Sequence, residues 1–412
     1  MGQDPESEQR RFRLPHLSRK VMITFVLLTT FIATFLPLTV YSESHIAGFD
    51  SFRSTIHDSL GSLSSSTSSR LFGTVRCPAN CPSDPYVQPG MLYFGNSTRD
   101  TRWVPFPQAE VNDINGEQGK RLSEVQPLND MEVEIYEAEG LMAGLVDRKE
   151  KTVRWARDKF VLFIGSSATS SSKDDRNNVD NFCTEAKGVS HGWGAHQGGF
   201  CHIEWLNLTV ANWFLFGMVD DESADWWKSG EARPITFENR IPQIMFKGME
   251  ENGLDSKRKP DLIVLSSLFW DENFIGETAK HYNVELDGAH GFTWTQIEWH
   301  RSRMQKLILY LRELYNDNDL PMMFRTRQIR KQAKWAGMLK IFQMDQSCRA
   351  ISRAMGLRYF TWGGKLEGFQ DYYDDDQHFR NGPATWLFGD MMLFYLRRAV
   401  LPGCWTCHQW DD

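Results

Sequence analysis

Short apolar runs alternate with longer stretches of helical periodicity through most of this chain. The apolar runs are 159–165, 261–266, 321–325 and 358–361, and the helical patterns are 175–187, 295–315, 343–355 and 384–400. Strands that alternate with helices are typical of a parallel sheet covered by helices on both faces. We therefore expect a three-layer α/β/α domain with a mainly parallel sheet. Ligands of such domains bind at the carboxyl ends of the strands.

A second feature is the run Val21–Tyr41, which contains 21 consecutive residues without a charge. A helix of about 20 apolar residues can cross a bilayer. The preceding residues carry more basic than acidic side chains, so the positive-inside rule places them in the cytosol. We expect a cytosolic tail (1–20), a transmembrane signal-anchor (21–41), a flexible Ser-rich stem (42–75) and a lumenal or extracellular domain (76–412). A cleaved signal peptide is the alternative.

The cysteines and glycosylation sequons fit a secretory compartment. All seven cysteines follow the apolar run, and disulfides persist outside the cytosol. Their odd number leaves at least one cysteine unpaired or paired between chains. Sequons at Asn96 and Asn207 lie on the same side. We expect a single-pass type II protein of the Golgi, the secretory pathway or the cell surface.

Charge and motif content exclude several classes of ligand. The net charge of −7 argues against a nucleic-acid partner. The segment Cys404-Trp-Thr-Cys407-His408 matches a haem-attachment motif, but a disulfide within the pair or to a distant cysteine is the preferred interpretation. The histidines are scattered without ligand spacing, so we expect no metal and no cofactor.

Two segments carry candidate catalytic residues. Gly165-Ser166-Ser167 follows the first apolar strand directly, where a serine is exposed above the sheet edge and backbone N–H groups can stabilise an oxyanion. Asp375 and His378 are three residues apart, which puts both on one face of a helical turn. An aspartate in that position fixes the tautomer of the histidine and leaves its other nitrogen as a base. An ordinary Ser-rich loop and an acidic surface run are the alternatives.

In order and spacing, these segments resemble the SGNH/GDSL superfamily, and within it the PC-esterase branch of plant trichome-birefringence-like polysaccharide O-acetyltransferases and fungal membrane-anchored relatives. The family has a strand ending in Gly-Asp-Ser, then Arg-Asn opening a helix. Here Gly165-Ser166-Ser167 precedes Arg176-Asn177. A later apolar strand runs into a loop with Trp270, Arg325-Thr326 follows the third strand, and Asp375-x-x-His378 precedes Gly382-Pro383 and Trp386.

The resemblance implies Ser167 as nucleophile, His378 as base and Asp375 as its orienting partner, with an acyl–serine intermediate. It also suggests Gly165, Gly199, Trp270 and Arg325 as residues near the oxyanion or substrate. The chain departs from the family at Ser166, where an aspartate is usual, and by six extra residues before Arg176. Keeping the Arg-Asn register instead would place Lys173 in the nucleophile position, with Ser172 beside it.

The sequence is therefore compatible with three functions. The first is a serine-dependent O-acyl esterase or O-acetyltransferase that acts on a carbohydrate or small ester. The second is an inactive, membrane-tethered glycan-binding protein of the same fold. The third is a type II glycosyltransferase, whose Asp-x-Asp metal site would be sought at 374–376.

Overall fold

The computed structural model of the chain describes residues 77–94, 97–106, 140–165, 178–192, 197–228, 233–284, 291–332 and 335–407. The chain divides into two units, Met1–Gly73 and Thr74–Asp412, and all described residues belong to the second. The expected tail, membrane span and stem lie outside the described residues, as do Asn96, Ser166 and Ser167. Among the helices that are described, none is both long and apolar enough to span a membrane.

A seven-stranded sheet forms the centre of the domain. Its spatial order is β4-β5-β6-β3-β7-β8-β9. The strands span Phe160–Gly165 (β3), Val189–Gly192 (β4), Gly198–Ile203 (β5), Leu208–Phe214 (β6), Leu262–Leu265 (β7), Met322–Arg325 (β8) and Arg358–Phe360 (β9). Strands β6, β3, β7, β8 and β9 are mutually parallel, whereas β5 is antiparallel to both β4 and β6. The expected mainly parallel sheet is confirmed.

The order of the five parallel strands fixes where a ligand crevice can form. In chain order they read 2-1-3-4-5, since β3 is first and β6 second. The direction of strand addition reverses between β3 and β7, and open parallel sheets bind ligands at such a switch point, outside the carboxyl ends of the strands. Residues that follow β3 and β7 therefore flank the expected crevice.

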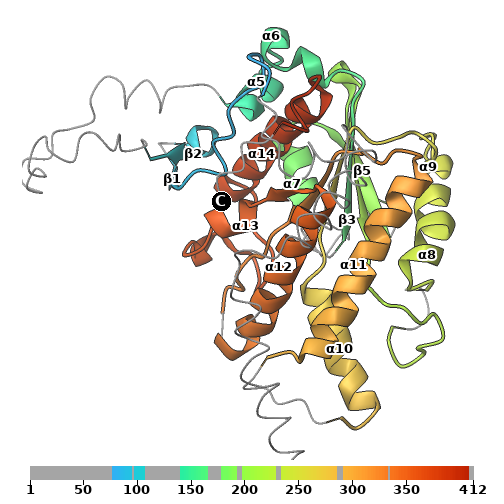
Figure 1. Ribbon diagram of the computed structural model, residues 1–412. Helices are drawn as coiled ribbons and strands as arrows, with labels where there is room; N and C mark the ends of the chain where they lie inside the picture. The colour runs from blue at the N-terminus through green and yellow to red at the C-terminus, as the bar shows by residue number, and fades with distance from the viewer. Residues whose placement is uncertain are drawn as a thin grey trace, which may run out of the picture. The chain divides into compact units, whose positions relative to one another are not determined.

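Alternating residues of the strands feed two hydrophobic layers. Val161 and Phe163 of β3 pack into one core with helices α7 (Asn178–Glu185) and α14 (Pro383–Val400). Leu162 and Ile164 point into the other, which contains α11 (Trp294–Leu314) and α12 (Trp335–Met355). Figure 1 shows α14 and α11 on opposite sides of the sheet. The three-layer α/β/α architecture is thus confirmed.

Several elements differ from the sequence expectation. Helix α12 begins eight residues before the expected Gln343, and α7 is shorter than the expected 175–187. Strands β4, β5 and β6 were not expected; β6 (LTVANWF) is buried along its whole length although it contains two polar residues. Helix α10 (Phe269–His281) follows β7 after the short link 266–268, and α8 (Phe237–Arg240) and α9 (Lys247–Glu251) precede β7.

Disulfides join distant parts of the domain. Cys77 pairs with Cys407 and Cys81 with Cys404, so the C-terminal Cys-x-x-Cys bonds to distant cysteines. A third disulfide joins Cys183 of α7 to Cys201 of β5. Cys348 is buried and free, as the odd number of cysteines predicted. Three disulfides are compatible with a secreted or lumenal domain.

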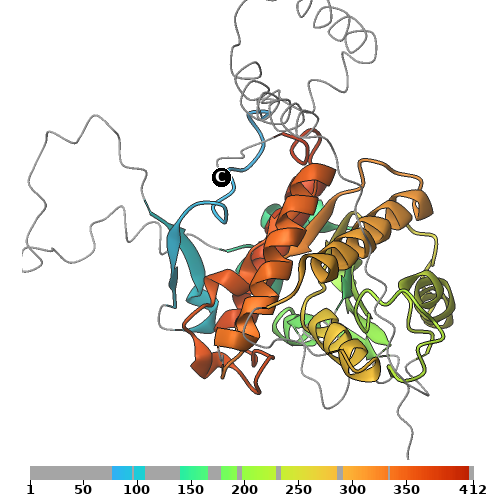
Figure 2. The same ribbon diagram turned by 60° about the horizontal axis from the view of Figure 1, so that its bottom comes forward.

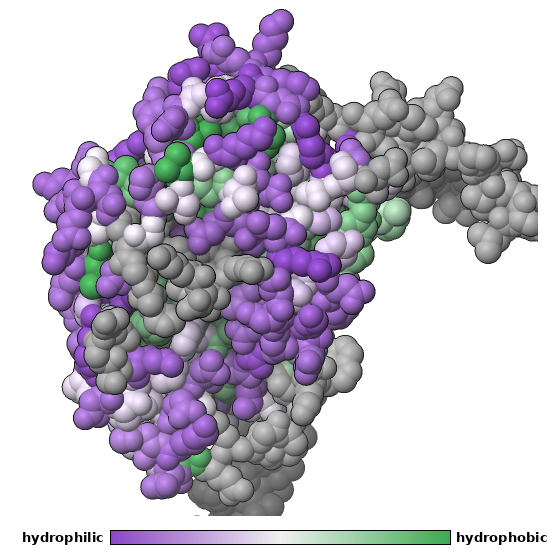
Figure 3. Space-filling view, turned by 180° about the vertical axis from the view of Figure 1, so that it is seen from behind, coloured by the Kyte–Doolittle hydropathy of each residue, from purple (hydrophilic) through white to green (hydrophobic). Residues whose placement is uncertain are grey.

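A two-stranded antiparallel hairpin, β1 (Gly90–Tyr93) and β2 (Arg102–Pro105), precedes the sheet in the chain. It lies beside the C-terminal helices in Figure 2, and β2 contacts α14. On the face seen in Figure 3, the described residues are mainly hydrophilic, with hydrophobic residues in small separate patches. The described part of this face therefore does not form one broad apolar surface.

Candidate active site

The ends of β3, β6 and β7 converge at the switch point. The Leu215 N–H donates to the Gly165 carbonyl at 2.6 Å, and the Ser266 N–H donates to the Ile164 carbonyl at 2.8 Å. A Cβ on Gly165 would lie 1.9 Å from the Ser266 carbonyl oxygen, so only glycine fits there. The chain leaves the described residues directly after Gly165, before Ser166 and Ser167.

Asp375 and His378 form a hydrogen-bonded pair. The Nδ1 atom of His378 lies 2.7 Å from Oδ2 of Asp375, while Oδ1 accepts the N–H groups of Gln377 and His378 at 2.7 and 2.8 Å. Burial acts to raise the pKa of the Asp375 carboxyl, but these hydrogen bonds outweigh it and hold the pKa below its ordinary value. The carboxylate is therefore ionised, so Nδ1 carries the proton and Nε2 is the basic nitrogen of His378.

A closed loop presents this pair. The expected helical turn is wrong: residues 373–379 form a loop closed by an isolated antiparallel bridge between Tyr373 and Phe379. The segment after β8 supports the loop, since the Lys331 N–H donates to the Asp376 carbonyl at 2.8 Å and Gln328 Nε2 donates to the Gln377 carbonyl at 2.5 Å. His378 has a side chain that is only 10% exposed, against 56% for Asp375. Backbone contacts thus fix the pair, and water reaches the Asp375 side chain but largely not that of His378.

Helix α7 connects the His378 loop to the segment that follows β3. The side-chain amide of Asn181 donates to the Phe379 carbonyl at 3.0 Å, and the Gly382 N–H hydrogen-bonds to the Glu185 carboxylate. Helix α7 begins at Asn178, and the residues between it and Gly165 include both candidate serines. The helix that closes the Ser-bearing segment is therefore anchored beside His378.

Of the other residues predicted from the sequence, some lie at the switch point and others lie away from it. Trp270 lies in the first turn of α10, where its ring packs edge-on against Phe214 and Phe216 beside the switch point. Arg325 ends β8 and is buried; burial lowers its pKa to about 10. Gly199 lies within β5, paired with Asn212 of β6 and Gly192 of β4, two strands away from β3. Asn207 is exposed, and its amide donates to Asp158 at 2.8 Å.

The sequence did not predict a buried hydrogen bond between α10 and the turn after β6, beside the crevice. Asp271 of α10 accepts the Met218 N–H at 2.6 Å, and this fixes the turn at Gly217, which has φ +94. Gly217, Met218, Ser267 and Trp270 pack together beside the crevice and leave no space for a water molecule between them. Ser267 Oγ is buried there and has no hydrogen-bond partner among the described residues. No local sequence motif signals the contact between Asp271 and Met218, which are 53 positions apart.

The acidic run 374–376 does not resemble a metal site. Asp375 binds His378, and Asp376 Oδ1 accepts the Gln332 N–H at 2.9 Å. Within the part of the chain that the structure covers, no group of three or more His, Cys, Asp or Glu side chains could hold a metal ion.

Comparison with protein-family models finds no match, and no curated protein matches the chain. Solved structures to which it is similar include a putative GDSL-like lipase from Parabacteroides merdae ATCC 43184, with 14% identity over 59% of this chain and 96% of that chain and a TM-score of 0.33. A mutant acetyl-xylooligosaccharide esterase from Geobacillus Stearmophilus has 12% identity over 58% and 94% of the two chains and a TM-score of 0.34. An alpha/beta hydrolase enzyme from the metagenome of Lake Arreo, Spain, has 12% identity over 60% and 98% and a TM-score of 0.33. A function for this chain therefore has to be argued from its own residues.

Proposed function

We propose that the protein is a serine-dependent O-acyl esterase or O-acetyltransferase of the SGNH/GDSL type, and that it acts on glycans in the secretory pathway. Ser167 is the nucleophile, His378 the base and Asp375 the residue that orients the base. The observation that carries the proposal is the ionised Asp375 bound to Nδ1 of His378, on a loop anchored to the helix that follows the Ser-bearing segment.

The chain geometry supports this assignment of the nucleophile. Ser167 is two residues beyond Gly165, the last residue of β3, in the chain. The His378 loop contacts the segment after β8 and helix α7, and β8 lies two strands from β3 in the same sheet. Residues that follow β8 thus support the His378 loop, at the same carboxyl-end edge of the sheet as Gly165.

In the proposed reaction, Ser167 Oγ attacks the carbonyl carbon of the ester while His378 Nε2 takes the hydroxyl proton. The resulting tetrahedral intermediate collapses, the bond from the acyl carbon to the alcohol oxygen breaks, and the proton on Nε2 passes to that oxygen. Water or a sugar hydroxyl then attacks the acyl–serine, with His378 taking its proton and returning it to Ser167. The Asp375 carboxylate stabilises the imidazolium in both half-reactions.

The turns on either side of β3 supply candidate donors for the oxyanion. The Gly217 backbone is held by the contact of Met218 with Asp271, and Ser267 Oγ is a buried hydroxyl beside it. A fixed donor in a site that excludes water is worth about 10²–10³ in turnover. We assign this role to the Gly217 N–H and the Ser267 hydroxyl, next to the predicted Trp270.

Two features support the glycan substrate and the compartment. The motif order from Gly165 to Trp386 resembles the PC-esterase branch, whose members transfer acetyl groups to polysaccharides. The disulfides of the domain and the exposed sequon at Asn207 fit the expected lumenal side of a type II membrane protein.

The test is active-site labelling of purified residues 76–412 with a fluorophosphonate, followed by mapping of the labelled peptide. We expect label on Ser167 that is lost in Ser167→Ala and in His378→Ala, whereas His281→Ala, an exposed histidine on α10, retains it. Label on Ser166 or Ser172 would reject the assignment of Ser167. A folded protein with no label would instead favour the inactive glycan-binding alternative.

Esterase and acyltransferase activities are separated by the product. In a second experiment, the enzyme is treated with an acetyl ester in place of the fluorophosphonate. The acetyl group is then followed into acetate or into an acetylated xylo- or manno-oligosaccharide. Acetate alone, at saturating oligosaccharide, identifies an esterase.

A further inference from the structure

A second cavity lies along β9, the last strand of the sheet. Its volume is about 340 Å³, within the range of small-molecule sites. Its walls come from the segment before β1, from β2, from the ends of β8 and β9, and from α13 (Trp362–Lys365). Strand β9 lies three strand spacings from β3, or about 14 Å, so this cavity is separate from the switch point.

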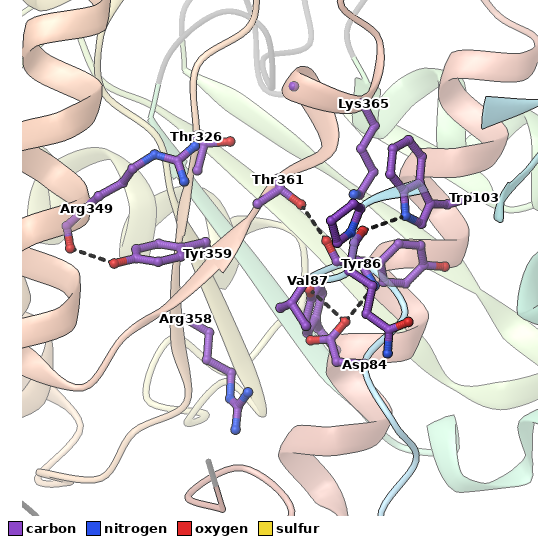
Figure 4. A pocket seen from close by; sticks show the side chains of 14 residues that line it. Asp84, Tyr86, Val87, Trp103, Thr326, Arg349, Arg358, Tyr359, Thr361 and Lys365 are labelled. Atoms are coloured by element: carbon purple, nitrogen blue, oxygen red, sulfur yellow. Dashed lines mark hydrogen bonds between the residues drawn. The ribbon is translucent and has the colours of Figure 1, made fainter. Parts of the chain in front are cut away.

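Lys365 is the central feature of the cavity. Lys365 is only 9% exposed. Its Nζ atom lies 3.6 Å from the ring centroid of Trp103 and 5.9 Å from that of Tyr86. Figure 4 shows the side chain pointing toward these two rings. Among the described residues, no carboxylate forms an ion pair with this ammonium. A buried cation without an ion-pair partner is costly, which indicates that a ligand supplies the counter-charge.

The other charged groups of the cavity leave it positive. Arg349 is bound to Asp345 at 2.9 Å, and Arg358 donates to the carbonyls of Trp405 and Cys407 at 2.6 and 2.7 Å. Asp84 is the single carboxylate among the described lining residues. It accepts the Tyr86 N–H at 2.9 Å and the Tyr395 hydroxyl at 3.3 Å. These fixed contacts leave Lys365 as the cation that can turn toward a ligand.

Burial lowers the pKa of Lys365 to about 7, while the charge of Asp84 acts in the opposite direction. A carboxylate bound at Nζ would raise that pKa and restore the charged form. The remaining lining includes aromatic faces, which suit a sugar ring. The hydroxyls of Thr326, Thr361 and Tyr359 donate to backbone carbonyls, so their oxygens can accept from the hydroxyls of such a ring.

We propose that this cavity binds the carboxylate of an acidic sugar residue, a hexuronate, with Lys365 as its ion-pair partner. The inference rests on the proposed function only in taking the hexuronate to be part of the glycan substrate. An oligosaccharide that carries its acyl ester at the switch point would place the acidic residue on a different sugar from the ester.

The experiment is calorimetric titration of residues 76–412 with D-glucuronate, D-glucose and acetate at pH 6.5. Glucose lacks the carboxylate and acetate lacks the ring. Lys365→Met removes the charge at similar length, Lys365→Arg keeps it, and Lys280→Met on the exposed face of α10 is the matched control.

We expect glucuronate to bind about 10- to 100-fold more tightly than glucose, the range for a charge-assisted hydrogen bond. Lys365→Met loses the same factor, whereas Lys365→Arg restores part of it and Lys280→Met changes nothing. Equal binding of glucose and glucuronate, or unchanged binding by Lys365→Met, would overturn the proposal. Acetate that binds as tightly as glucuronate would overturn the assignment to an acidic sugar.

The same titration on Ser167→Ala separates this inference from the proposed function. Retained glucuronate binding supports the cavity whether or not Ser167 is the nucleophile. Binding that is lost in Ser167→Ala would contradict a separate site.

Discussion

The Asn181 side chain donates a hydrogen bond to the Phe379 carbonyl, one residue beyond His378, across 198 positions of the chain. Both groups are buried. The contact holds α7, which follows the Ser-bearing segment in the chain, against the loop that carries the proposed base.

Asn181→Leu should therefore act on catalysis through position. Loss of a donor to a buried carbonyl costs about 1–3 kcal/mol. We expect kcat for an aryl acetate to fall about tenfold with little change in KM, because the imidazole is misplaced while the substrate still binds. Asn252→Leu is the control, because this exposed residue follows α9 and donates only to the nearby Gly248 carbonyl. A variant with reduced stability but unchanged kcat would show that Asn181 has only a structural role.

Asp375→Asn should lower turnover by about two to four orders of magnitude, the range for disturbing a positioned base. The amide cannot fix the Nδ1-protonated tautomer or stabilise the imidazolium. Asp371→Asn, an exposed aspartate in the same region, provides the comparison. Equal rates of aryl acetate hydrolysis in Asp375→Asn and the wild-type protein would remove Asp375 from the mechanism.

Arg303→Met should destabilise the domain by about 1–3 kcal/mol, because it leaves the buried Met218 and Val219 carbonyls without their donor and leaves Glu238 with Lys306 as its ion-pair partner. Arg303 donates to both carboxylate oxygens of Glu238 and to the carbonyls of Met218 and Val219, beside the proposed oxyanion site. Arg301→Met, which breaks only an exposed pair with Glu298, should cost under about 1 kcal/mol in urea unfolding.

The difference in unfolding free energy between wild type and Arg303→Met should depend on pH in one direction. Burial opposes the charged form of Glu238, but hydrogen bonds from Arg303 and Lys306 outweigh it and lower its pKa from 4.5 to about 2. A lowered carboxyl pKa contributes stability above the unfolded value that is lost as pH falls. The gap between wild type and Arg303→Met should therefore shrink as pH falls from about 4.5 toward 2. A gap that is constant over this window would contradict the ion pair as its cause.

Lys365→Met should stabilise the ligand-free domain most at low pH. Since the pKa of Lys365 is lowered from 10.5 to about 7, the unfolded chain binds more protons between these values, and stability rises with pH through that window. The facing groups are Asp84, Tyr86, Arg349 and Arg358. Guanidinium unfolding at pH 6.5 and 9 should show a larger gain for Lys365→Met at the lower pH, and Lys280→Met should show no such trend.

The sequence predicted the parts of the fold that carry uniform patterns. β3 and β7 are continuous apolar runs, and α11 and α14 have clear helical periodicity. β6 was missed because Thr209 and Asn212 interrupt its apolar run, yet both are buried in the sheet. Apolar patterning cannot reveal a polar residue that tertiary structure encloses.

The candidate site was predicted unevenly for a related reason. Asp375 and His378 are three residues apart, so their pairing follows from local sequence even though the helical turn was wrong. The contact of Asp271 with Met218 and that of Lys365 with Trp103 join residues 53 and 262 positions apart. Neither has a local motif, and each depends on how the strands are ordered. The bonding partners of Cys404 and Cys407 lie more than 320 positions away for the same reason.

Cys77 and Cys81 are bonded to Cys407 and Cys404, so the first and last described segments share one covalent junction. Tension applied at Cys77 is passed through the disulfide to Cys407 as well as along the backbone toward β1. If the domain is tethered at its N-terminal side, the two disulfides therefore transmit part of the force directly to Cys404 and Cys407. These covalent bonds do not depend on the packing of the hydrophobic core.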